Sequence, residues 1–78
     1  MLSSQAVWKS MDVVAQRKGV SLPRLALMSD LDQAVFSNAR RNRNWMSLMT
    51  LAKVLNATEI SVSEWAKIVE KLQEEEKV

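Results

Sequence analysis

Residues 33–44 hold the side chains of this sequence whose types and spacing have the clearest chemistry. The first group consists of three uncharged polar residues and one alanine: Gln33, Ala34, Ser37 and Asn38. Gln and Asn side chains form paired hydrogen bonds with adenine, and a small apolar side chain fits the thymine methyl group. The second group follows directly and alternates basic and amide side chains: Arg40, Arg41, Asn42, Arg43 and Asn44. Guanidinium groups bind phosphate oxygens, so the segment has the chemistry to read bases and hold a nucleic-acid backbone, although a charge run by itself is more often solvated surface.

The sequence has few residues that could support catalysis or metal binding. The 78 residues include no Cys and no His, which removes disulfides, thiolate metal sites and the commonest general base. Asp12, Asp30 and Asp32 are scattered and form no catalytic pair. We therefore expect no enzyme, metal, cofactor or small-molecule ligand.

Charge is distributed unevenly, although the net charge is only +2. Residues 1–45 carry seven basic against three acidic side chains, a net +4, and residues 46–78 carry four against six, a net −2. No apolar run is long enough for a membrane span and no leader segment is recognisable, so a cytoplasmic protein is expected. The basic half contains residues 33–44, which favours a nucleic-acid partner for that half.

The elements that must position these side chains are helices. With one Gly, one Pro and no alternating apolar pattern, the chain is expected to be a single all-α domain over residues 1–78. Caps and periodicity place five helices over Ser4–Lys18, Ser21–Ser29, Gln33–Arg40, Ser47–Ala57 and Ser61–Leu72. The acidic tail, residues 73–78, is expected to be frayed.

The third of these helices has a well-defined start. Asp32 is a good N-cap, and Leu31 before it has the spacing to Phe36 of a hydrophobic staple. Phe36 and Ala39 are then the buried side chains, so Gln33 and its polar neighbours are expected to face outward.

Several short motifs carry a resemblance to a known family. Leu25-Ala26, Leu31, Phe36 and Ala39 match the pattern of a helix-turn-helix, and the segment TLAKVL from Thr50 to Leu55 resembles the family sequence that joins the fourth and fifth helices. RNWMS, residues 43–47, is similar to an RPRWPS segment found in one branch of repressors. The chain thus resembles the Cro/C1-type (phage-repressor-like, XRE family) DNA-binding domain over about residues 5–70.

The resemblance implies a five-helix lambda-repressor-like fold with the helix-turn-helix on helices 2 and 3. It implies a bacterial or phage transcriptional regulator, a repressor acting as a homodimer on double-stranded DNA. Helix 3 would contact bases through Gln33, Ala34, Ser37 and Asn38. Phosphate contacts would come from Ser21, Arg24, Arg40, Arg41, Asn42, Arg43 and Asn44. For Arg24, pairing with an acidic side chain is an equal alternative.

Met46 stands where the family pattern has Pro, and two further positions, Asp30 and Glu59, stand where Gly is usual. If both require positive φ, Asp tolerates that conformation better than Glu.

Other apolar residues are expected mainly in the core. This holds for Trp8, Trp65 and the methionines at 11, 28, 46 and 49, and for Leu48 and Ala52 on the fourth helix. Trp45 is expected there too, with a DNA-facing loop as the alternative. The fifth helix carries a stripe that fits a dimer seam or packing on the first helix equally well: Val62, Trp65, Val69 and Leu72. The rival function is a protein-interaction module of the same fold, an anti-repressor or adaptor that does not bind DNA.

Overall fold

The computed structural model describes residues 2–42 and 44–76, and these residues form five helices and no strand. The helices are α1 (Ser4–Lys18), α2 (Leu22–Met28), α3 (Gln33–Arg41), α4 (Leu48–Thr58) and α5 (Val62–Glu76). The all-α prediction and the five helix positions are confirmed to within a few residues. Within the described part, no helix is both long and apolar enough to cross a membrane.

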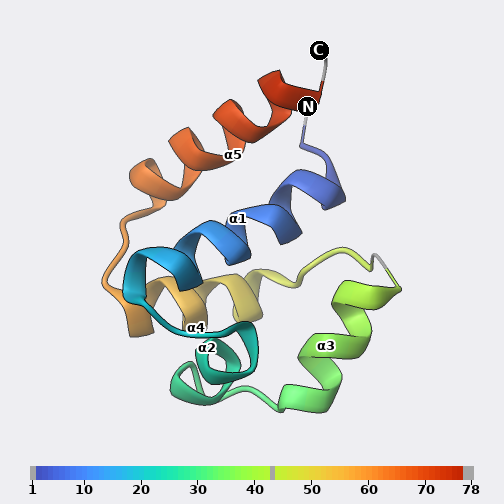
Figure 1. Ribbon diagram of the computed structural model, residues 1–78, viewed down its shortest axis with the longest axis vertical. Helices are drawn as coiled ribbons and strands as arrows, with labels where there is room; N and C mark the ends of the chain where they lie inside the picture. Colours follow the sequence, from blue (N-terminus) through green and yellow to red (C-terminus); the bar gives the residue numbers. More distant parts are fainter. Residues whose placement is uncertain (1, 43, 77–78) are drawn as a thin grey trace.

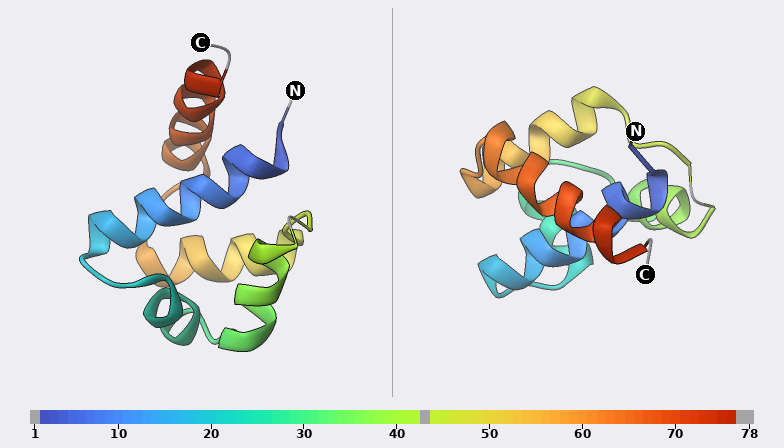
Figure 2. Two further views of the ribbon diagram at one scale, coloured as in Figure 1. Left: turned by 45° about the vertical axis from the view of Figure 1, so that its right-hand side comes forward. Right: turned by 90° about the horizontal axis from the view of Figure 1, so that it is seen from above.

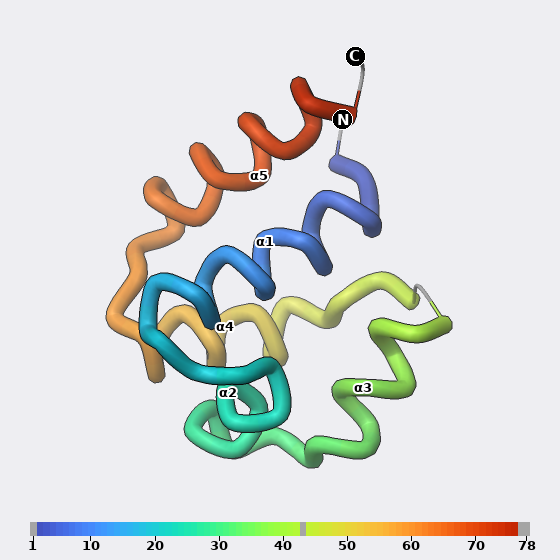
Figure 3. Tube along the Cα trace, viewed as in Figure 1, coloured from blue at the N-terminus to red at the C-terminus, as the bar shows by residue number. Residues whose placement is uncertain are grey.

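The helices are stacked along the longest dimension of the molecule, 33 Å (Figure 1). α5 lies at one end and packs along α1, α4 lies beneath α1, and α2 and α3 form the opposite end (Figures 1 and 2). The tube in Figure 3 shows α1 and α5 running side by side. Consequently α5 does not cover α3.

Side-chain caps fix where all five helices begin, and at α1 the Ser3 hydroxyl oxygen accepts a hydrogen bond from the backbone amide of Ala6 at 2.9 Å. Ser21, Asp32, Ser47 and Ser61 each accept a hydrogen bond from the backbone amide three residues later, at 3.3, 3.0, 3.1 and 3.1 Å respectively. Each cap satisfies an amide that has no partner within its own helix. Gly19 ends α1 in the left-handed conformation at φ 68°, which Gly adopts without strain.

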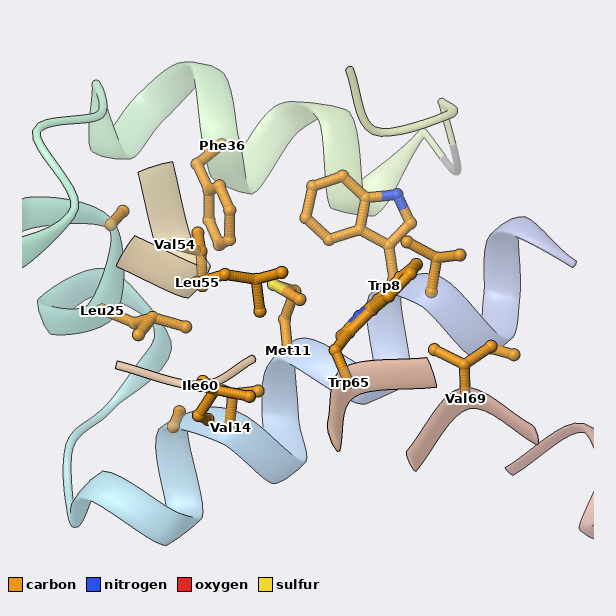
Figure 4. Close-up of a cluster of buried hydrophobic side chains, with 14 residues drawn as sticks. Trp8, Met11, Val14, Leu25, Phe36, Val54, Leu55, Ile60, Trp65 and Val69 are labelled. Carbon is orange, nitrogen blue, oxygen red and sulfur yellow. The ribbon is translucent and has the colours of Figure 1, made fainter. Parts of the chain in front are cut away.

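A buried polar contact joins α1 to α5. The indole N–H of Trp65 donates to the Ser10 hydroxyl at 2.9 Å, and that hydroxyl donates in turn to the carbonyl of Val7. Trp65 and Val69 are both buried, as Figure 4 shows for their side chains beside α1. The two helices are therefore held by apolar burial and by a polar chain whose members are all satisfied.

The last turn of α5 corrects one prediction. Residues 73–76 are helical and not frayed, and the side-chain oxygen of Gln73 accepts a hydrogen bond from the backbone amide of Ser3 at 2.9 Å. This contact fastens the end of α5 to the start of α1. Residues 77 and 78, also predicted to fray, lie outside the described residues.

The core runs from the α1–α5 contact toward α3 (Figure 4). Met11, Val14, Leu25 and Val54 are fully buried and come from three different helices. Trp8 is also buried, so the prediction that Trp8 and Trp65 are core residues is confirmed.

Several residues expected in the core are instead exposed. Leu48 and Met49 occupy the first turn of α4, and Trp45 lies in the segment leading to it. Ala52 is exposed one turn after Leu48, while Leu51, Val54 and Leu55 form the inward face of α4. The prediction was wrong for Met28 as well, which is exposed.

Asp30 and Glu59 both adopt the left-handed conformation, at φ 57° and 58°. Both positions therefore have the geometry that usually selects Gly, and each non-Gly side chain adds strain there.

Candidate nucleic-acid interface

The position of α3 is set by the turn before it and by one aromatic contact. The amide of Leu31 donates to the carbonyl of Ala26 at 2.9 Å, closing the turn between α2 and α3. Phe36 is buried and meets Trp8 edge to face, with ring centroids 5.1 Å apart and planes at 74°. Phe36 is the buried residue of α3, and Leu31 and Ala39 pack partly against the same core. This anchor fixes which face of α3 points outward.

The predicted base-contacting residues share the outward face. Gln33, Ala34 and Asn38 are exposed and Ser37 is half-buried. At 100° per residue these positions lie on the side of the helix away from Phe36 and Ala39. The structure therefore brings together the four side chains that the sequence grouped.

The start of α2 adjoins the same side of α3. Leu22 and Pro23 line a cleft of about 540 Å³ together with Ser37, Arg41 and Lys9 of α1. Ser21 and Arg24 are exposed at this helix start, and the Ser21 hydroxyl oxygen caps the backbone amide of Arg24. Sequence reasoning missed Lys9, because only the fold brings α1 beside α3.

The side chain of Arg40 is turned toward α1. Its guanidinium lies 3.0 Å from the carboxylate of Asp12 on α1, with both side chains about half exposed. The predicted phosphate contact at Arg40 thus competes with an ion pair inside the chain. No local pattern signals this pair, since its members are 28 residues apart.

The remaining polar residues lie at the end of α3. Arg41 is exposed, and Asn42 is exposed at the helix C-cap. The carbonyl of Asn44 accepts a hydrogen bond from the Trp8 indole N–H at 2.7 Å, while its amide donates to the Ala39 carbonyl at 3.0 Å. Asn44 is thus held by its backbone and its side chain remains exposed. Arg43, also predicted to contact phosphate, lies outside the described residues.

The residues predicted as a possible dimer seam have different environments. Trp65 and Val69 are buried against α1 and Leu72 is half-buried, which corresponds to the packing alternative. Val62 alone of the four is exposed. Trp65 and Val69 therefore already pack within the chain and present no surface to a second copy.

Among the described residues, no group of three acidic side chains is placed to hold a metal ion. Searches of protein-family models, curated proteins and solved structures found no significant match to this chain.

Proposed function

We propose that this chain is a sequence-specific double-stranded DNA-binding transcriptional regulator, with α3 as the helix that enters the major groove. The observation that carries the proposal is the exposed polar face of α3, formed by Gln33, Ala34, Ser37 and Asn38. An α-helix fits the width of the major groove, and residues near its start reach the base edges.

Phosphate contacts would flank this face. Arg41 is exposed at the end of α3, and Lys9 lines the cleft beside it. Exposed Ser21 and Arg24 lie at the start of α2, next to Leu22 and Pro23, which line the same cleft. Such contacts orient a protein on the duplex and supply most of the salt-dependent affinity.

The assignment as a repressor, acting as a homodimer on a palindromic site, rests on the resemblance of the Leu25-Ala26 and Thr50–Leu55 motifs to phage-type repressors. Occupying DNA that a polymerase needs would be sufficient for repression. The five-helix order and the turn between α2 and α3 are compatible with the lambda-repressor-like arrangement.

A protein-interaction module is the second candidate, because the surface beside α3 is apolar. Trp45, Leu48 and Met49 are all exposed there. A chain that had lost DNA binding would keep such a surface without needing basic side chains around α3.

The proposal is tested by fluorescence anisotropy with a random-sequence duplex, titrated at several salt concentrations. The chain should bind at low salt, with an affinity that falls linearly on logarithmic axes. Arg41→Ala should make the slope shallower by about 0.9, the value for one lost phosphate contact. Arg40→Ala is the matched control and should change it less, because Asp12 already partners that guanidinium. Absence of binding at low salt would support the interaction module instead.

A further inference from the structure

Among the described residues, a single carboxylate lines the cleft between α1, α2 and α3, where it lies among cationic side chains. Asp12 shares this lining with Lys9 of the same helix and with Arg40 and Arg41 of α3. Lys9 and Arg41 belong to the proposed phosphate contacts. Because a carboxylate repels phosphate oxygens, the charge of Asp12 opposes the role proposed for its neighbours.

Asp12 also makes a direct contact with one of these cations. Nη2 of Arg40 lies 3.2 and 3.0 Å from Oδ1 and Oδ2 of Asp12 and donates a hydrogen bond to each oxygen. Lys9 and Arg41, by contrast, form no ion pair with any described residue. The two paired side chains are 45% and 44% exposed, so their contact contributes little to the fold and can be broken while the aromatic anchor of α3 remains.

The position of Arg40 on α3 shows what this contact prevents. At 100° per residue, Arg40 lies about 20° from Gln33 and about 60° from Ser37 around the helix axis. Its side chain therefore starts at the edge of the polar face of α3. From that edge an extended arginine can reach the backbone of a duplex that receives the polar face, but the guanidinium is instead directed to α1.

We propose that Asp12 is a positioning residue that withholds Arg40 from DNA phosphates and so lowers the affinity of the chain for DNA of any sequence. The inference rests on the proposed function, since it needs a duplex on the polar face of α3. Asp12 and a phosphate compete for the same guanidinium, and a phosphate contact carries no sequence information. Withholding one such contact weakens binding to all sequences alike, which leaves the base contacts of α3 with a larger share of the affinity.

A purely structural role for Asp12 predicts the opposite change in affinity. If the ion pair mainly held α3 against α1, its removal would loosen the recognition helix and weaken DNA binding. If the pair restrains Arg40, its removal frees a guanidinium and strengthens binding. The sign of the change therefore separates the two roles.

Fluorescence anisotropy with a random-sequence duplex, titrated at several salt concentrations, measures the effect of Asp12→Asn. At about 0.1 M salt this variant should bind about 5-fold more tightly than wild type, with a logarithmic salt slope steeper by up to about 0.9, the value for one phosphate contact. Asp12→Glu keeps the carboxylate and should stay within about 2-fold of wild type. Glu70→Gln controls for net charge, because Glu70 is exposed on α5 at the end of the molecule opposite to α3 (Figure 1), and it should change the affinity by less than about 2-fold.

Arg40→Gln supplies the second half of a double-mutant cycle. In that background Asp12→Asn should change the affinity by less than about 2-fold, because no guanidinium remains to be released. A gain that persists in full would overturn the inference, since Asp12 would then act only as a general negative charge. Far-UV circular dichroism verifies that all variants are helical.

Two further outcomes separate this inference from the function on which it rests. Unchanged or weaker binding by Asp12→Asn, beside a wild-type chain that binds the duplex, would overturn the inference and leave the proposed function standing. Absence of binding at low salt by both the wild-type chain and Asp12→Asn would overturn the two together.

Discussion

Trp65 and Trp45 are the same residue type in opposite settings. Trp65 is 9% exposed, and its indole N–H donates to Ser10 in the contact between α1 and α5. Trp45 is 61% exposed in the segment between α3 and α4. At one end of the molecule a tryptophan fastens two long helices, and at the other it remains at the surface beside α3. The comparison separates a region that maintains the fold from a region with surface available for partners.

The other contacts of the two regions, the α1–α5 contact and α3, differ in the same way. The α1–α5 contact buries Val69 and is closed at its end by the hydrogen bond between Ser3 and Gln73. α3 is held by Phe36 against Trp8 and by the half-exposed pair of Arg40 with Asp12. Because an exposed ion pair contributes little, the aromatic contact is the main anchor of α3.

The largest predicted difference in the free energy of unfolding is between variants of the two tryptophans. Trp65→Ala should lower the free energy of unfolding by about 3–5 kcal/mol, because it removes a large buried ring and leaves a cavity. Trp45→Ala should lower it by less than about 1 kcal/mol, as expected for an exposed residue. Urea denaturation followed by circular dichroism measures both, at low protein concentration to avoid association. Similar losses for the two variants would remove the distinction between the regions.

Substitution of Ser10 provides a sharper test, since Ser10→Ala removes one hydroxyl and little volume. Ser10→Ala would leave the buried Trp65 N–H without its acceptor, so a loss of about 1–3 kcal/mol is expected. Ser29→Ala is the matched control. The Ser29 hydroxyl is buried and has no hydrogen-bond partner among the described atoms, so its removal should be neutral or slightly stabilising. Thermal melts of the two variants should therefore shift in different ways, and equal destabilisation would argue against a specific role for the α1–α5 polar contact.

Backbone strain is a property that the two regions share, and its relief should have the smallest effect. Glu59→Gly should stabilise the chain by about 1 kcal/mol, because φ 58° suits Gly and strains Glu. Asp30→Gly should stabilise it less, since Asp tolerates the left-handed conformation better. Glu59→Ala keeps the strain and should bring no gain. A gain for Ala equal to that for Gly would show that the lost carboxylate, and not φ, is responsible.

The sequence was sufficient to predict the helices because their signals are local. N-caps such as Asp32 and Ser47 and the left-handed Gly19 mark helix ends within a few residues. The outward face of α3 was predictable for the same reason, since Phe36 and Ala39 define the inward side by their spacing alone.

The features that the sequence did not give depend on contacts between distant residues. The pairing of Arg40 with Asp12 and the position of Lys9 beside Arg41 require α1 to pass α3. Trp45 and Leu48 were expected inside because apolar residues in a small domain usually are. Their exposure depends on how the start of α4 lies in space relative to α3. No residue pattern in this chain specifies that arrangement.

The central claim, that the polar face of α3 binds duplex DNA, is tested most directly by two matched charge changes. Ala34→Glu and Ser63→Glu each add one negative charge at an exposed second position of a helix, α3 and α5 respectively, so net charge and helix stability should change alike. Anisotropy with a random duplex at low salt should show binding weakened at least 10-fold by Ala34→Glu and by less than 2-fold by Ser63→Glu. Equal effects of the two changes, or no effect of either, would contradict the assignment of α3 as the DNA-binding helix.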